Sequence, residues 1–236
     1  MISWLQKLIS YFTPVILYSG KGVRHEHIEV SVRNGRLQLA VPDAIYSNDI
    51  NYPPFVAAWE ELHDFPVDQW EVVLILGFGL GSVPAILHKK HDRRDIHMVG
   101  VDYEKTATDI ARNYKQEIYR GPWELVDMEV SAYLKEALIR KSASRVITKP
   151  AALAFVDLFV GMEVHPIIYD PVFWQSLLQI MIPNAKVAVN YMSTNHERQA
   201  SFEALLADMF AEVRKIPCGK NWCYILGARK DGDTKS

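Results

Sequence analysis

The sequence predicts an α/β fold with a doubly wound, mostly parallel seven-stranded sheet. An apolar run, Val72–Leu76, leads directly into Gly77, Gly79 and Gly81, which is typical of a central parallel strand followed by a tight turn. Further along the chain, strand-like and helix-like stretches alternate, as right-handed βαβ crossovers require. The last two strand-like stretches are separated by only a short turn, so we expect an antiparallel C-terminal hairpin at one edge.

The first segment, Met1–Leu17, predicts a short amphipathic helix. Its apolar residues fall on one helical face. We expect the helix to pack on the body or on a partner subunit, with attachment to a membrane surface as the alternative. The segment is too short and too polar to span a bilayer, and it lacks the features of a signal peptide. The residues on that face are Trp4, Leu5, Leu8, Ile9 and Phe12.

A small N-terminal β-hairpin is expected next, at Ile28–Ala44. Apolar residues alternate with polar or small ones on both sides of Asn34-Gly35, which is a strong signal for a two-residue turn. A polar, proline-containing loop follows at Tyr46–Pro54, and then a helix at Phe55–His63.

The rest of the chain divides into alternating elements. Beyond the first strand, strands are expected at Ile96–Val101, Leu125–Glu129, Ala154–Phe159 and Lys186–Tyr191, with the hairpin formed by Ala211–Pro217 and Trp222–Arg229. Helices are expected at Ser82–Lys90, Lys105–Gln116, Ser131–Ile139, Pro171–Ile180 and His196–Phe210. We therefore assign residues 1–65 to an N-terminal extension, 66–230 to a cofactor-binding domain and 231–236 to a mobile tail.

Composition restricts the classes of partner. The chain of 236 residues has a formal net charge of −2, which argues against a nucleic-acid-binding protein, because such proteins normally present a basic face. Cys218 and Cys223 are the only cysteines. They lack the spacing of a zinc site, so we expect free buried thiols, no metal and a cytoplasmic location.

The glycine spacing indicates which nucleotide is bound. A dinucleotide-binding loop carries glycine at its first, third and sixth positions. Here the sixth position is Ser82, and the third glycine is Gly81 instead. This spacing resembles the loop that binds S-adenosylmethionine (AdoMet), and it disfavours an NAD-linked dehydrogenase.

Two acidic residues follow the next two predicted strands. Asp102 can accept hydrogen bonds from both ribose hydroxyls, or it can cap the helix that begins near Lys105. Glu129 can accept the exocyclic amine of adenine, with the Val130 N–H near the ring. We prefer Glu129 to Asp127 for this contact, and an exposed strand-end acid is the alternative.

These features together resemble the spermidine synthase family, which has the AdoMet-dependent class I methyltransferase fold. A parallel sheet that ends in an antiparallel hairpin is typical of that fold. The resemblance covers roughly residues 27 to 228. Its motifs are Gly77-Phe78-Gly79-Leu80-Gly81-Ser82, Val101-Asp102-Tyr103-Glu104, Glu129 ahead of Tyr133-Leu134, Phe155-Val156-Asp157 and the Gly35–Leu39 hairpin.

The resemblance implies a cofactor, a reaction centre and an assembly. The cofactor is AdoMet or decarboxylated AdoMet. Asp157 lines the reaction centre, Tyr52 and Phe159 line the substrate side, and a homodimer forms with the N-terminal hairpin as its interface. The cofactor-binding residues that it implies are Gly77, Phe78, Gly79, Gly81, Asp102, Tyr103, Glu129 and Val130.

Departures from the family pattern bear on the reaction. The family carries a second aspartate three residues after the first, and here that position is Val160. Its Tyr-His-Glu triplet appears as Tyr52-Pro53-Pro54. A diamine acceptor loses most of its anchors, so these changes disfavour true spermidine synthase activity. Glu163 or His165 could supply a replacement base, or both could be solvated lid residues.

Two functions follow from this pattern. The first is a transferase that moves a methyl or aminopropyl group from the cofactor to a small acceptor, which we expect to be an amine. Asp157 would orient or deprotonate that nucleophile. The second is a catalytically silent protein that keeps the fold and binds a nucleoside or a partner.

Overall fold

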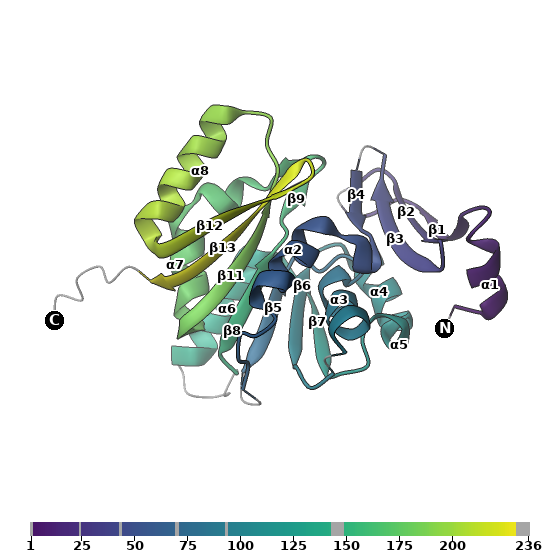
Figure 1. Cartoon of the computed structure of the whole chain (residues 1–236), viewed down its shortest axis with the longest axis horizontal. Coiled ribbons are helices and arrows are strands. Elements are labelled where there is room, and N and C mark those ends of the chain that lie inside the picture. Colours follow the sequence, from purple (N-terminus) through teal and green to yellow (C-terminus); the bar gives the residue numbers. More distant parts are fainter. Residues whose placement is uncertain are drawn as a thin grey trace.

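Two β-sheets organise the chain (Figure 1). The structure is a computed structural model, and it describes residues 2–23, 25–42, 44–68, 71–92, 94–142 and 149–229. The tail predicted at 231–236 lies outside these ranges. One sheet has four strands near the N-terminus, and the other has seven strands and holds most of the core.

The N-terminal sheet confirms the predicted hairpin and extends it by one strand on each side. Strands β2 (Ile28–Arg33) and β3 (Arg36–Val41) are antiparallel and meet at the Asn34-Gly35 turn. Both turn residues have positive φ, as this type of turn requires. Strands β1 (Val15–Gly20) and β4 (Ala44–Ser47) flank the hairpin as edge strands.

The N-terminal helix is shorter than predicted. Helix α1 spans only Trp4–Ile9, and Ser3 caps its start. The prediction of a helix extending to Leu17 was wrong, because Pro14 cannot continue a helix interior and the segment that follows it joins β1. None of the residues of α1 is buried, so the helix does not pack its apolar face on the body of the chain.

The seven-stranded sheet has the predicted doubly wound topology. Its order is β12-β13-β11-β8-β5-β6-β7, and the pairings β11–β8, β8–β5, β5–β6 and β6–β7 are all parallel. The C-terminal hairpin is antiparallel, as expected. The strands are β5 (Val72–Leu76), β6 (Met98–Asp102), β7 (Trp123–Asp127), β8 (Ala151–Val156), β11 (Met181–Tyr191), β12 (Phe210–Cys218) and β13 (Asn221–Arg229).

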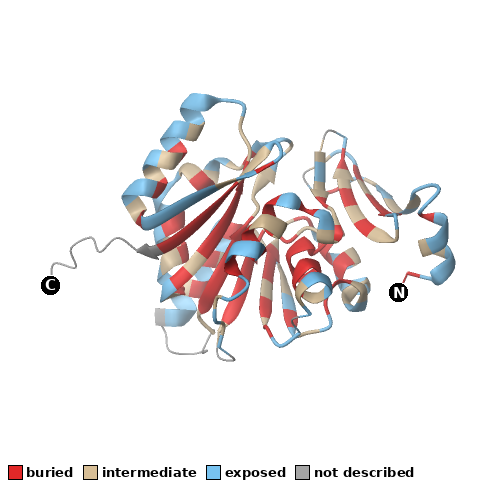
Figure 2. Ribbon diagram, in the orientation of Figure 1, coloured by how far each residue is buried: buried red, intermediate tan, exposed pale blue. Residues whose placement is uncertain are grey.

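Helices cover both faces of this sheet, and the sheet between them is largely buried (Figure 2). Alternate residues of β5 explain why. Val73 and Ile75 join the core on one face, whereas Leu74 and Leu76 join the core on the other. The first face packs against α2 (Pro53–Leu62), α3 (Ser82–His91), α4 (Lys105–Asn113) and α5 (Lys115–Ile118). The second packs against α6 (Val130–Ser142), α7 (Pro171–Gln179) and α8 (His196–Met209).

Short elements connect the two sheets at the carboxyl ends of the parallel strands. Strand β8 ends at Val156, earlier than predicted, and the chain then forms the two-stranded pair β9 (Phe159–Val160) and β10 (Glu163–Val164). The remaining short helices are η1 (Asp49–Asn51) and η2 (Pro166–Tyr169). Apolar residues of the N-terminal sheet share one core with α2 and β5, so this sheet is fixed against the ends of the large one.

Candidate active site

Two adjacent cavities lie where the parallel strands end. We call the inner cavity the one that Gly79, Asp102 and Glu129 line, and the outer cavity the one that Asn51, Lys220 and Asn221 line. Carboxyl ends of strands are where open α/β sheets place their ligands. Three aromatic side chains, Tyr46, Tyr52 and Phe159, line both cavities and form the boundary between them.

Two of the predicted glycines line the inner cavity, for different reasons. A Cβ on Gly77 would lie 2.1 Å from the backbone oxygen of Asp157, so this glycine allows two chain segments to touch. A Cβ on Gly79 would meet Ser47 Cβ at an ordinary 3.5 Å. The protein therefore leaves space beside Gly79, as a loop that holds a ligand requires.

Phe78 and Gly81 lie away from the cavity. The Phe78 side chain is only 3% exposed, and its ring stacks on Trp123 with centroids 5.1 Å apart. Gly81 precedes α3 with φ 82°, and a Cβ there would collide with Ile118 and Phe78. Both residues were predicted to contact the cofactor, but they pack behind the loop and do not line the inner cavity.

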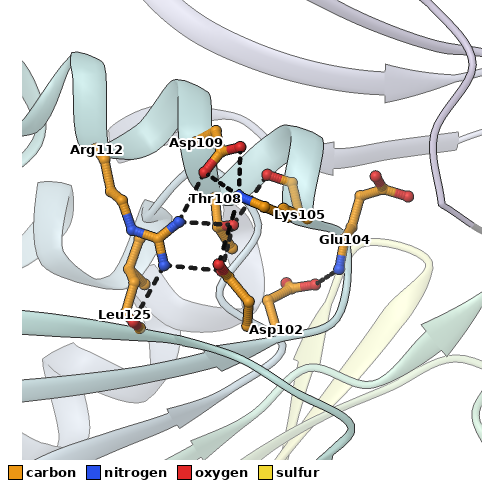
Figure 3. Close-up of polar contacts among 8 residues, drawn as sticks. Asp102, Glu104, Lys105, Thr108, Asp109, Arg112 and Leu125 are labelled. Carbon is orange, nitrogen blue, oxygen red and sulfur yellow. Dashed lines mark hydrogen bonds and ion pairs between the residues drawn. The ribbon is translucent and has the colours of Figure 1, made fainter.

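Asp102 ends β6 and lies between the glycine loop and α4. Its Oδ2 accepts a hydrogen bond of 2.8 Å from Gly79 N–H. Its Oδ1 accepts one of 2.8 Å from Glu104 N–H (Figure 3). Burial raises the pKa of Asp102, and the backbone N–H groups oppose that rise. Since a carboxylate has about four acceptor positions, it retains capacity for hydroxyl groups in the inner cavity, where the predicted residue Tyr103 also lies.

Two acidic residues at the end of β7, Asp127 and Glu129, have different surroundings. Asp127 Oδ1 accepts hydrogen bonds from Arg112 at 2.8 Å and from Thr108 at 2.6 Å. Burial alone would raise the pKa of Asp127, but these bonds outweigh it and lower the pKa. Arg112 lies on α4, and its guanidinium also donates hydrogen bonds to Asp109 and to the Leu125 backbone oxygen (Figure 3). Asp127 is thus committed to a structural ion pair.

Glu129 and Val130 differ from Asp127 in their position relative to the inner cavity. Both line the inner cavity, and Val130 begins α6. The contact of Glu129 with an adenine base therefore stays a prediction, for a residue that lines the inner cavity.

Asp157 follows β8 and lines the inner cavity. Its Oδ1 accepts hydrogen bonds from Asn190 Nδ2 at 2.8 Å and from the Tyr52 hydroxyl at 3.2 Å. Asn190 is fixed in turn, because its Oδ1 accepts a bond of 2.8 Å from Asn221. Burial raises the pKa of Asp157 to about 7, against the opposing effect of the Asn190 and Tyr52 bonds. Within the described chain, Oδ2 has no hydrogen-bond donor and remains open.

Known proteins resemble this chain in structure more than in sequence. No protein-family model and no curated protein matches the sequence significantly. Solved structures do match. A probable spermidine synthase from Corynebacterium glutamicum aligns with a TM-score of 0.64 and 13% identity, over 93% of this chain and 82% of that one. Spermidine synthase from Thermotoga maritima aligns with a TM-score of 0.59 and 14% identity, over 93% and 74%.

A methyltransferase gives a similar match. Human methyltransferase-like protein 13 in complex with SAH aligns with a TM-score of 0.58 and 14% identity, over 78% of this chain and 82% of that one. The chain has the fold of spermidine synthases and class I methyltransferases. The predicted fold class is therefore confirmed.

Within this transferase fold, the network around Asp157 contains residues that the sequence analysis missed. Asn190 interrupts the apolar run of β11 next to Val189, so a polar residue inside a buried strand was an available signal. Asn221 and Tyr46 carried no such signal. The Tyr46 hydroxyl donates a bond of 3.1 Å to the backbone oxygen of Gly161, which joins the N-terminal sheet to the β9–β10 turn.

The two candidate replacement bases differ in position. Glu163 is exposed and lies 3.8 Å from Arg198, and it does not line the inner cavity. His165 lines that cavity, but its Nδ1 accepts a bond of 3.1 Å from Ile167 N–H. A neutral imidazole that accepts at Nδ1 carries its proton on Nε2, so its one basic nitrogen is already engaged by the Ile167 N–H.

The described residues also bear on metal binding and on membrane insertion. Across residues 2–229, leaving out the undescribed gaps, no group of three or more His, Cys, Asp or Glu side chains is arranged to hold a metal ion. In that same part of the chain, every helix is too short or too polar to cross a bilayer. Cys218 and Cys223 are free, buried thiols, as predicted.

Proposed function

We propose that this protein is a transferase that uses AdoMet or decarboxylated AdoMet and moves a methyl or aminopropyl group to the nitrogen of a small amine. The observation that carries the proposal is the position of Asp157. Asp157 lines the inner cavity together with Asp102 and Glu129. It accepts a hydrogen bond from Tyr52, which also lines the outer cavity, where an acceptor could bind. Solved neighbours of this fold that contain SAH or the analogue AdoDATO support the cofactor class.

The inner cavity fits an adenosine moiety. Asp102 offers acceptor oxygens for ribose hydroxyls, Glu129 offers them for an exocyclic amine, and the space beside Gly79 lets the backbone approach a ligand. When bound, the cofactor supplies a carbon activated by a sulfonium group. Asp102 and Glu129 are the residues that would hold it.

Asp157 has the properties of a residue that accepts a proton from an incoming amine. A pKa of about 7 matches the pH range in which a general base is most effective. Asn190 and Tyr52 both bind Oδ1, so Oδ2 is oriented for the nucleophile. Holding the amine in line with the activated carbon supplies most of the rate enhancement in this scheme.

The outer cavity indicates the kind of acceptor. Its described lining carries two cations, Arg33 and Lys220, together with several side-chain amides, and includes no carboxylate. Among the described lining residues, the second ammonium of a diamine would have no anionic partner. We therefore propose an acceptor with one reactive amine and a neutral or anionic remote end.

A homodimer is part of the proposal, with the N-terminal sheet as its interface. Strand β4 is an edge strand, and its Ile45 is exposed, so a second copy can extend the sheet. Light scattering with Ile45→Lys tests it, since the added charge should shift a dimer toward monomer.

The experiment that tests the function combines binding and turnover. Melting temperature is measured with AdoMet, decarboxylated AdoMet, methylthioadenosine and NAD, where saturation at about 100 times Kd adds about 2.7 kcal/mol. Product formation is then assayed with monoamines, amino acids and putrescine. Stabilisation by an adenosyl ligand with Asp157-dependent product supports the proposal. Stabilisation without any product favours the catalytically silent alternative, and stabilisation by NAD alone contradicts both.

A further inference from the structure

A contiguous apolar patch at the N-terminus faces solvent. Trp4 is 76% exposed, Tyr11 64% and Phe12 87%. Figure 1 shows α1 at one extremity of the molecule, away from the large sheet, and Figure 2 shows it mostly exposed. We define the N-terminal apolar patch as Trp4, Leu5, Leu8, Ile9, Tyr11, Phe12 and Ile16.

Polar contacts fix the patch in this outward orientation. Ser10, which follows α1, accepts a backbone bond of 2.9 Å from Asn34 N–H and a side-chain bond of 2.8 Å from Gly35 N–H. Lys7 forms an ion pair of 2.8 Å with Glu117 on α5. The helix is therefore held by its polar side, and its apolar side is left for something outside the chain.

The hairpin end beside the patch carries more cations than acids. Arg33 and Arg36 are paired opposite each other where the hairpin meets Ser10, and Lys7 lies on α1 itself. Glu117 pairs with Lys7 and Glu29 pairs with Arg33. Arg36 has no ion pair within the described chain. The described residues at this end therefore carry one uncompensated positive charge.

We propose that the N-terminal apolar patch docks this protein on an anionic lipid surface. Trp, Tyr and Phe favour the interface between lipid headgroups and acyl chains, and neighbouring cations add attraction to anionic lipids. Helix α1 lies in the plane of that interface. A symmetric contact between two copies through this patch would instead bring like charges together, because the same surface meets itself.

Vesicle sedimentation tests the proposal. The probes are phosphatidylcholine vesicles with and without phosphatidylglycerol. The wild-type protein should sediment with the anionic vesicles, and added salt should weaken this binding. The double variant Trp4→Ser/Phe12→Ser should bind at least about tenfold more weakly. Arg36→Gln should lower the affinity about fivefold, and only for anionic vesicles.

A matched control distinguishes binding through the patch from nonspecific hydrophobic binding to vesicles. Val172 on α7 is 61% exposed, so Val172→Ser removes an exposed apolar group elsewhere and should leave vesicle binding unchanged. The melting temperature of the double variant should also stay near that of wild type, because the substituted side chains are exposed. Absence of sedimentation with anionic vesicles, or a dimer that only the double variant dissociates, would overturn the proposal.

Discussion

The side-chain amide of Asn190 donates a hydrogen bond of 2.8 Å to Oδ1 of Asp157. Because Asn221 donates to the Asn190 oxygen, the amide cannot rotate without breaking that contact. The Tyr52 hydroxyl donates a hydrogen bond to the same Oδ1. One oxygen of the carboxylate is therefore held by the protein, and the other is free to act.

The variant Asp157→Asn should lose transfer activity but be more stable than wild type above pH 7. The wild-type carboxyl has a pKa of about 7 in the folded state, against the ordinary aspartate value of 3.8. Between those values the folded state binds a proton that the unfolded state has lost, so wild-type stability falls as pH rises through this range. The amide of the variant does not titrate, and its single oxygen can accept both existing bonds. We expect a gain on the order of 2 kcal/mol above pH 7.

Denaturant unfolding at several pH values measures this difference. The gain should shrink as pH falls and vanish below the ordinary pKa of 3.8, where the wild-type carboxyl is protonated in both states. A variant that is less stable than wild type at every pH would show that Asp157 is an ordinary structural carboxylate.

Asn190→Ala should shift the titration of Asp157 to higher pH. The lost donor stabilises the ionised form, so its removal raises the pKa of the carboxyl, by about one unit for a bond to a charged group. The rise of activity with pH, or the pH dependence of stability, should move upward by the same amount. Asn221→Ala should give a smaller shift, because it only releases the amide of Asn190. Equal loss of activity at all pH values, with no shift, would argue for packing alone.

Glu129→Gln should weaken ligand binding, whereas Asp127→Asn should lower the stability of the fold. Glu129 lines the inner cavity, so its change should weaken adenosyl-ligand binding about tenfold. Asp127 bonds Arg112 and Thr108, so its change should cost about 1 kcal/mol of stability. Titration calorimetry and thermal unfolding measure the two effects. Weaker binding in the Asp127 variant alone would reverse the assignment.

Gly79→Ala and Gly77→Ala should separate a ligand effect from a folding effect. Space exists for a Cβ at Gly79, so this variant should fold, with a loss of about 1 kcal/mol from its positive φ, and should lose ligand-induced stabilisation. At Gly77 a Cβ would strike the Asp157 backbone oxygen, so the folded protein itself should be destabilised by more than about 2 kcal/mol. If Gly79→Ala keeps the full ligand-induced shift, the loop does not hold the ligand.

Local patterns predicted most of the large domain. An apolar strand followed by glycines, and acids at strand ends, place Asp102, Glu129 and Asp157 together because parallel strands end at one edge. The contacts of Asn190 with Asn221 depend on pairing between β11 and β13, which no local pattern encodes. Periodicity predicted the apolar face of α1, but it could not show whether that face would be covered.

A Cβ at Gly77 has no room beside the Asp157 backbone oxygen, so the glycine loop and Asp157 are packed against each other. A mutation that displaces one of them disturbs the other, so changes in this half of the site will be selected against together. Most residues that line the outer cavity come from the N-terminal sheet, α2 and the β12–β13 turn, away from this contact. The proposed acceptor side can therefore diverge during evolution while the proposed cofactor side stays in place.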